Sequence, residues 1–168
     1  CRDRDLPDIS EYRRALILKN ARVLFFAEQT DQWWQRFFEA ERPVILGGQE
    51  WSEAHFATEA CTEAAVLALH SMGDLCAQIV NLVVLRGELS EDNVSLGSVV
   101  SRLDKVGTAG DVLCALKQLQ SLQAFDYVRA FANTVKHACL VNAGFRAEYG
   151  ESYRNAQGVI FDEFSYKG

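Results

Sequence analysis

The feature that most constrains the fold is a long apolar stretch, residues 52–86, in which glycine occurs once and proline never. Ser52 is a favourable N-cap residue, and Gly87 suits the left-handed position after a helix end. The stretch therefore predicts one continuous helix, roughly 50 Å long at about 1.5 Å per residue. Because apolar residues surround most of its axis, we expect this helix in the centre of a helical bundle.

Apolar residues recur at helical intervals in three further stretches, 8–41, 94–106 and 111–141. The first stretch opens at Asp8, three residues before a glutamate, which is the spacing of a capping box. We expect a break in the last stretch near Ser121. The chain thus predicts about four helices joined by short connections.

After the last helical stretch the pattern changes, and residues 145–168 read as two strands joined by a polar loop. Short connections between long helices favour antiparallel neighbours. We therefore predict an all-α fold: a single domain over residues 1–168, built as an antiparallel bundle of about four helices with a short C-terminal β-hairpin.

The composition is that of an ordinary globular protein, with 168 residues, 49% of them hydrophobic and 24% charged. The net charge of −6 disfavours a dedicated non-specific nucleic-acid binder, which usually carries a concentrated positive surface. Local basic patches remain compatible with this balance.

The 5 cysteines include no C-x-x-C pair, and four of them fall inside apolar helical stretches. They read as small buried hydrophobes in a reducing compartment. No apolar run reaches the ~18 residues of a membrane span, and the charged N-terminus shows no signal peptide. We expect a cytoplasmic protein with no membrane partner. Since the chain starts without Met, we expect the natural protein to be longer.

The apolar stripe of the first helix, 8–41, is wider than burial on one side requires. It ends in an aromatic cluster, and exposed clusters of this kind mark contacts between proteins. We predict a homodimer whose contact contains Trp33, Trp34, Phe37 and Phe38.

On the central helix, 52–86, the few polar residues fall on one side. They are Glu59, Glu63, His70, Asp74, Gln78 and Asn81. His70 and Asp74 are four residues apart, so the carboxylate can orient the imidazole. One interpretation is a polar cleft containing Glu63, His70, Asp74 and Asn81. The other is the narrow solvent-exposed face of the helix, and both stay open.

Metal-binding patterns are weak. The di-iron arrangement needs Glu-x-x-His on two helices, which this chain lacks, and its three histidines have no H-x-x-x-H spacing. We predict no metal and no cofactor. A single site from Glu63, His70 and Asp74 remains an alternative, as does a metal-dependent nucleotide hydrolase, since the acidic residues loosely resemble those of Mg-dependent nucleotide pyrophosphohydrolases. The doubled acidic motif of those enzymes is missing.

A second polar stripe lies near the end of the last helix, where Asp126, Arg129, Asn133 and His137 share one face. A cation, an amide and an imidazole side by side could hold a phosphate and move a proton. Alternatively, Lys136 and His137 simply favour the C-terminal end of the helix dipole.

The segments Leu69–Asp74 and Phe131–His137 and the terminal Phe164–Gly168, in this layout, resemble uncharacterised bacterial proteins related to HEPN-like helical bundles. The sharp part of the resemblance is the Asn-x-x-Lys-His segment at 133–137. HEPN domains are typically dimeric, and many are metal-independent ribonucleases with an Arg-x(4 to 6)-His motif. Here seven residues separate Arg129 from His137, so the chain departs from that motif.

The resemblance implies roles for four residues if the activity carries over. His137 would be the general base on the 2′-hydroxyl, Arg129 or Lys136 would stabilise the phosphorane charge, and Asn133 would position the group. We favour a dimeric binding or regulatory module for a protein or nucleotide partner. The alternative is a HEPN-type endoribonuclease acting on RNA in bacterial defence or a toxin–antitoxin pair.

Overall fold

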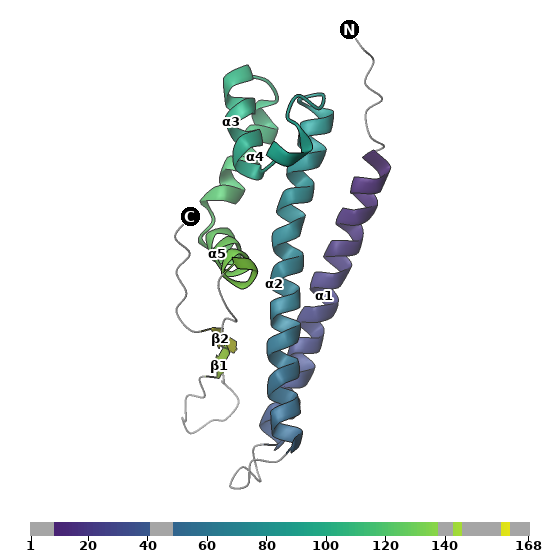
Figure 1. The fold of residues 1–168 in the computed structure, drawn as a ribbon, viewed down its shortest axis with the longest axis vertical. Coiled ribbons are helices and arrows are strands. Elements are labelled where there is room, and N and C mark those ends of the chain that lie inside the picture. Colours follow the sequence, from purple (N-terminus) through teal and green to yellow (C-terminus); the bar gives the residue numbers. More distant parts are fainter. Residues whose placement is uncertain (1–8, 41–48, 138–142, 146–158, 162–168) are drawn as a thin grey trace. The chain divides into compact units, whose positions relative to one another are not determined.

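The computed structural model describes residues 9–40, 49–137, 143–145 and 159–161, and they form an all-α helical bundle (Figure 1). The predicted all-α class is confirmed. These residues contain five α-helices and one 3-10 helix. Their bounds are α1 Ile9–Ala40, α2 Gln49–Val83, η2 Glu91–Asn93, α3 Leu96–Val106, α4 Gly110–Ser121 and α5 Gln123–His137.

Two three-residue strands follow α5, β1 Ala143–Phe145 and β2 Val159–Phe161. They pair antiparallel, with Ala143 opposite Phe161. Most of the hairpin predicted over residues 145–168 lies outside the described residues, so that hairpin stays a prediction.

The central helix α2 begins and ends three residues earlier than predicted, at Gln49 and Val83. Ser52 therefore lies inside the helix instead of capping it. At the other end, Arg86 and Gly87 both adopt left-handed backbone conformations, with φ of 55° and 69°. The Gly87 N–H donates to the Asn81 carbonyl at 2.8 Å, a wide turn that stops the helix before the predicted residue 86.

The described part of the helix predicted over 111–141, up to His137, contains two helices, α4 and α5, separated at Leu122, which has an extended backbone. The expected break near Ser121 is confirmed. The preceding helix α3 is capped at both ends by residues close to it in the sequence. Ser95 and Ser98 form a capping box at its start, and Gly107 adopts φ 67° at its end.

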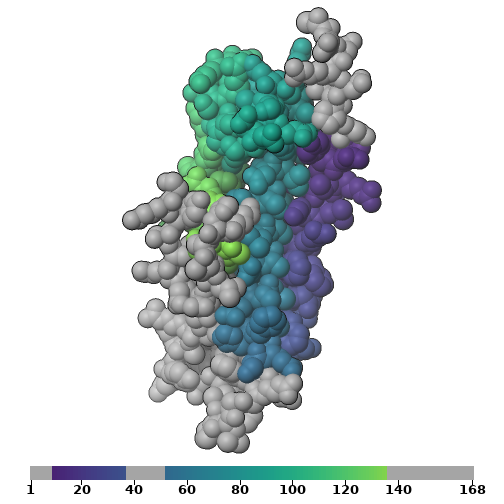
Figure 2. Space-filling view, viewed as in Figure 1, coloured from purple at the N-terminus to yellow at the C-terminus, as the bar shows by residue number. Residues whose placement is uncertain are grey.

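The chain, predicted as one domain, divides into two compact units: residues 1–22 with 67–128, and residues 23–66 with 129–168. The first unit has its core where the end of α2 meets α3 and α4. Core residues are Ala77, Leu85, Leu96, Val99, Val100, Leu103 and Leu116. Val99 and Leu103 have no exposed surface. In the space-filling view the atoms of α3 and α4, coloured teal to green, form one continuous surface (Figure 2).

In the second unit, α1 and α2 approach each other at Thr30 and Thr62, whose hydroxyls are 3.4 Å apart. Along α2, the Thr62 hydroxyl donates to the Thr58 carbonyl and the Thr58 hydroxyl donates to the Ala54 carbonyl, both at 2.7 Å. Thr58 is fully buried, and the bond to the Ala54 carbonyl satisfies its hydroxyl within its own helix.

Within the described residues, Ser52–Val83 of α2 is long and apolar enough to cross a bilayer by length and composition, with 28% of its most apolar window buried. The core helix of a soluble protein meets the same criterion. The absence of a membrane partner therefore stays a prediction.

Candidate functional site

The residues proposed for phosphate chemistry lie on the last turns of α5. Arg129 and Asn133 are four residues apart on one helical face, with Arg129 exposed and Asn133 half-buried. The backbone of Lys136 and His137 belongs to the final turn, but their side chains lie outside the described part of the chain. The meeting of Arg129, Asn133 and His137 therefore stays a prediction.

On α2, the predicted contact between His70 and Asp74 is present. The His70 Nδ1 lies 3.8 Å from an Asp74 carboxylate oxygen, and the two side chains are 14% and 59% exposed. A protonated imidazole would form an ion pair here. A contact of this length at a partly solvated helix face contributes at most about 1 kcal/mol. Glu63, the remaining acidic member of the predicted cleft, is half-buried on the same helix.

Asn81, the fourth predicted member of the cleft, is 2% exposed and holds the loop that follows α2. Its Nδ2 donates to the Leu89 carbonyl at 2.9 Å, and its Oδ1 accepts from the Leu89 N–H at 3.1 Å. A buried amide needs such partners. Both ends of the amide thus fasten the loop, and this geometry lends no support to a ligand-binding role for Asn81.

Two ion pairs in the first unit were not predicted. Arg102 forms a bidentate pair with Glu88, its Nε donating to Oε2 at 2.8 Å and its Nη2 to Oε1. The hydrogen bonds from Arg102 lower the pKa of Glu88. Lys117 donates to Asp104 at 2.7 Å and joins α4 to α3. The first pair joins α3 to the loop after α2, and the second joins α4 to α3.

A third unpredicted contact lies within α2, where the His55 Nδ1 is 3.5 Å from a Glu59 oxygen. The four-residue spacing, by which His70 and Asp74 were recognised, could also have found this pair.

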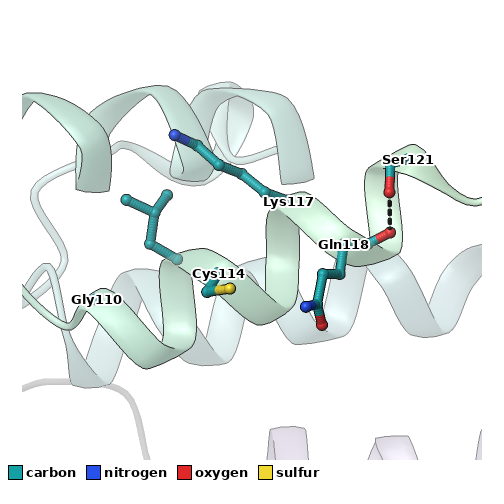
Figure 3. A pocket seen from close by; sticks show the side chains of 6 residues that line it. Gly110, Cys114, Lys117, Gln118 and Ser121 are labelled. Carbon is teal, nitrogen blue, oxygen red and sulfur yellow. Dashed lines mark hydrogen bonds between the residues drawn. The ribbon is translucent and has the colours of Figure 1, made fainter.

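A surface hollow of about 410 Å³ runs along α4 (Figure 3). It is lined by Gly110, Leu113, Cys114, Lys117, Gln118 and Ser121. The ammonium of Lys117 is held by Asp104, and the Ser121 hydroxyl donates to the Gln118 carbonyl at 2.7 Å. Every lining residue comes from one helix, so the hollow has no second wall to enclose a ligand.

The thiols differ in exposure. Cys61 and Cys76 are half-buried, and burial raises the pKa of each thiol. Cys114 is exposed, which corrects the prediction that it is a buried hydrophobe. The reason is that Cys114 lies on the face of α4 that forms the hollow, away from the core residue Leu116.

In the part of the chain that the structure describes, no three His, Cys, Asp or Glu side chains gather closely enough to hold a metal ion. Among the described residues, no such cluster supports the alternative metal site from Glu63, His70 and Asp74.

The predicted dimer contact on α1 is only partly described. Trp33 and Trp34 are half-buried, and the Arg36 guanidinium lies 4.6 Å from the Trp33 ring centroid. The side chains of Phe37 and Phe38 lie outside the described residues.

Within α1, the large apolar side chains that are most exposed lie nearer its start. They are Ile17 at 60%, Leu18 at 51%, Leu24 at 63% and Phe25 at 55%. The sequence shows the wide apolar stripe to which they belong, but periodicity alone does not say which side of a wide stripe is covered.

Comparison of the chain with protein-family models, with curated proteins and with solved structures gives no match. The arguments about function therefore rest on the residues and their geometry.

Proposed function

We propose that the chain is a non-catalytic, HEPN-like helical module that acts in the bacterial cytoplasm by binding, and that it works as a homodimer. One observation carries the proposal: the exposed apolar side chains on α1, of which Leu24 and Phe25 keep 63% and 55% of their surface in solvent. Contiguous exposed apolar surface on a folded protein marks an interaction site.

The polar groups of the first unit support a binding role over catalysis. Asn81 holds a loop, Arg102 is bound to Glu88, and Lys117 is bound to Asp104. Groups that close loops and join helices are positioned for the fold. They do not converge on an enclosed cavity in the described residues.

The test is the mass of the wild-type protein in solution, measured by size-exclusion chromatography with light scattering over a concentration series. We expect a species of twice the 18.8 kDa chain mass that dissociates on dilution. A protein that stays monomeric at every concentration would contradict the proposal.

A second candidate function is a metal-independent endoribonuclease, favoured by the face that Arg129 and Asn133 share on α5. Labelled single-stranded RNA in excess chelator tests it, comparing wild type with His137→Ala and with His55→Ala as the matched control. Cleavage lost only in His137→Ala would establish the nuclease and overturn the non-catalytic proposal. No cleavage by the folded wild-type protein would dismiss the nuclease.

A further inference from the structure

The exposed face of α1 is symmetric in residue type about Ala21. Ile17 and Phe25 lie four residues to either side of Ala21, and Leu18 and Leu24 lie three residues to either side. Seven residues out, the two ends carry opposite charges, Arg14 before and Glu28 after. We call these seven residues the Ala21 face.

The seven residues share one side of α1. At 3.6 residues per turn they fall within an arc of about 120°, with Ala21 near its middle. Every one of them is exposed. The helix is continuous from Ile9 to Ala40, so the face is a property of one element.

The opposite side of α1 is the covered one. Tyr12, Leu16, Val23 and Phe26 are half-buried and fall on that side, as does Thr30, whose hydroxyl meets Thr62 of α2. The side that α1 turns toward its own chain is therefore distinct from the Ala21 face, and α1 is apolar on both.

From this arrangement we infer that the Ala21 face binds the same face of a second copy of the chain, antiparallel, with the twofold axis passing at Ala21. The inference rests on the proposed homodimer and names its surface. An isologous contact requires a patch that is complementary to itself after a twofold rotation. Along the Ala21 face come a cation, two apolar residues, Ala21, two apolar residues and an anion. A twofold rotation about Ala21 therefore places the cation against the anion and the apolar pairs against each other.

The charges select the antiparallel orientation. An axis at Ala21 brings Arg14 against Glu28 of the partner subunit, and the rotation repeats the pair at the other end. It also brings Ile17 against Phe25 of the partner subunit and Leu18 against Leu24 of the partner subunit. A parallel pairing would instead set Arg14 against Arg14 and Glu28 against Glu28, which is repulsive.

The spacing suits two helices packed along their length. Arg14, Leu18, Ala21, Phe25 and Glu28 follow one another at intervals of four, three, four and three residues, the spacing of a coiled-coil seam. The small side chain of Ala21 at the axis lets the two backbones approach closely. Gln32 donates to Glu28 at 3.3 Å and holds the carboxylate on this side of the helix.

The test is a charge exchange across the twofold axis, read as the dimer dissociation constant by analytical ultracentrifugation. Arg14→Glu and Glu28→Arg each create like-charge pairs at both ends of the contact, so we expect each to weaken the dimer roughly tenfold or more. The double variant Arg14→Glu/Glu28→Arg restores both pairs and should return to within about threefold of wild type. Arg22→Glu, the same change on α1 about 100° away from Ala21, should leave the dimer unchanged.

Each result separates the claims. A monomeric wild-type protein overturns the homodimer and this inference together, and it leaves the apolar face to a different protein or a lipid surface. A wild-type dimer that responds to Arg14→Glu no more than to Arg22→Glu overturns the Ala21 face alone. Weakening by both single variants without rescue by the double variant overturns the antiparallel orientation. Circular dichroism of each variant establishes that it is folded.

Discussion

The core of the first unit and the Ala21 face contain the same kinds of side chain in opposite surroundings. Leu103 on α3 has no exposed surface, whereas Leu24 on α1 is 63% exposed. Apolar side chains from the end of α2, from α3 and from α4 pack around Leu103 and bury it. No described part of the chain buries Leu24 in this way. Apolar side chains thus stabilise the monomer in the first region and are available for an interface in the second.

The largest effect should come from truncating one leucine in each region. Leu103→Ala leaves a cavity in the core and should lower the free energy of unfolding by about 2–5 kcal/mol. Leu24→Ala, at an exposed position, should change it by no more than about 0.5 kcal/mol in the monomer. Urea denaturation at a concentration where the protein is monomeric measures both. Equal losses of unfolding free energy in the two variants would contradict the distinction between the buried core and the exposed Ala21 face.

A smaller effect is expected where the loop closes over the core. Asn81→Ala removes both hydrogen bonds to Leu89 and should lower the free energy of unfolding by about 1–3 kcal/mol, because it leaves part-buried backbone groups unsatisfied. Asn81→Asp is the matched variant, since it keeps the acceptor for the Leu89 N–H and loses the donor. Urea denaturation and hydrogen exchange at the Leu89 amide report the loss. Unchanged exchange in Asn81→Ala would show that the loop is held by other contacts.

The smallest effect concerns the exposed pair that borders the core. Arg102 lowers the folded-state pKa of Glu88 below its ordinary value of 4.5, so the folded state favours the carboxylate. This contribution to stability is present above pH 4.5 and is lost as the pH falls through the folded-state pKa. Glu88→Gln should lack this component. Urea midpoints measured against pH should therefore differ between the two proteins above pH 4.5 and converge below it. A constant difference would show that the pair contributes no pH-dependent stability.

The helices were predictable because their signals are local. The periodicity located the α-helical stretches but not the 3-10 helix η2 at Glu91–Asn93. The capping of α3 and the break near Ser121 depend on neighbouring residues in the sequence. The end of α2 was placed wrongly because Arg86 adopts a left-handed conformation. The residue type at position 86 does not predict this conformation, because the conformation depends on the loop that Asn81 holds.

The candidate sites were less predictable. The His70 and Asp74 contact follows from a four-residue spacing on one helix, and the structure contains it. The Glu88 and Arg102 pair joins residues that are 14 apart in the chain, and Lys117 and Asp104 are 13 apart. Glu88 and Arg102 become neighbours only where the loop after α2 meets α3, and Lys117 and Asp104 only where α4 packs on α3. No spacing rule could therefore have found either pair.

By itself the sequence determined that the chain is helical, where most of its helices lie, and that the apolar stripe of α1 is wider than burial on one side requires. These properties depend on residue order within one helix, through the 3.6-residue period. Only the tertiary structure decided that Asn81 holds a loop, that Cys114 is exposed, and that the Ala21 face remains in solvent while the opposite side of α1 is covered. Burial depends on which elements pack together, and that is a sum over contacts between residues distant in the chain.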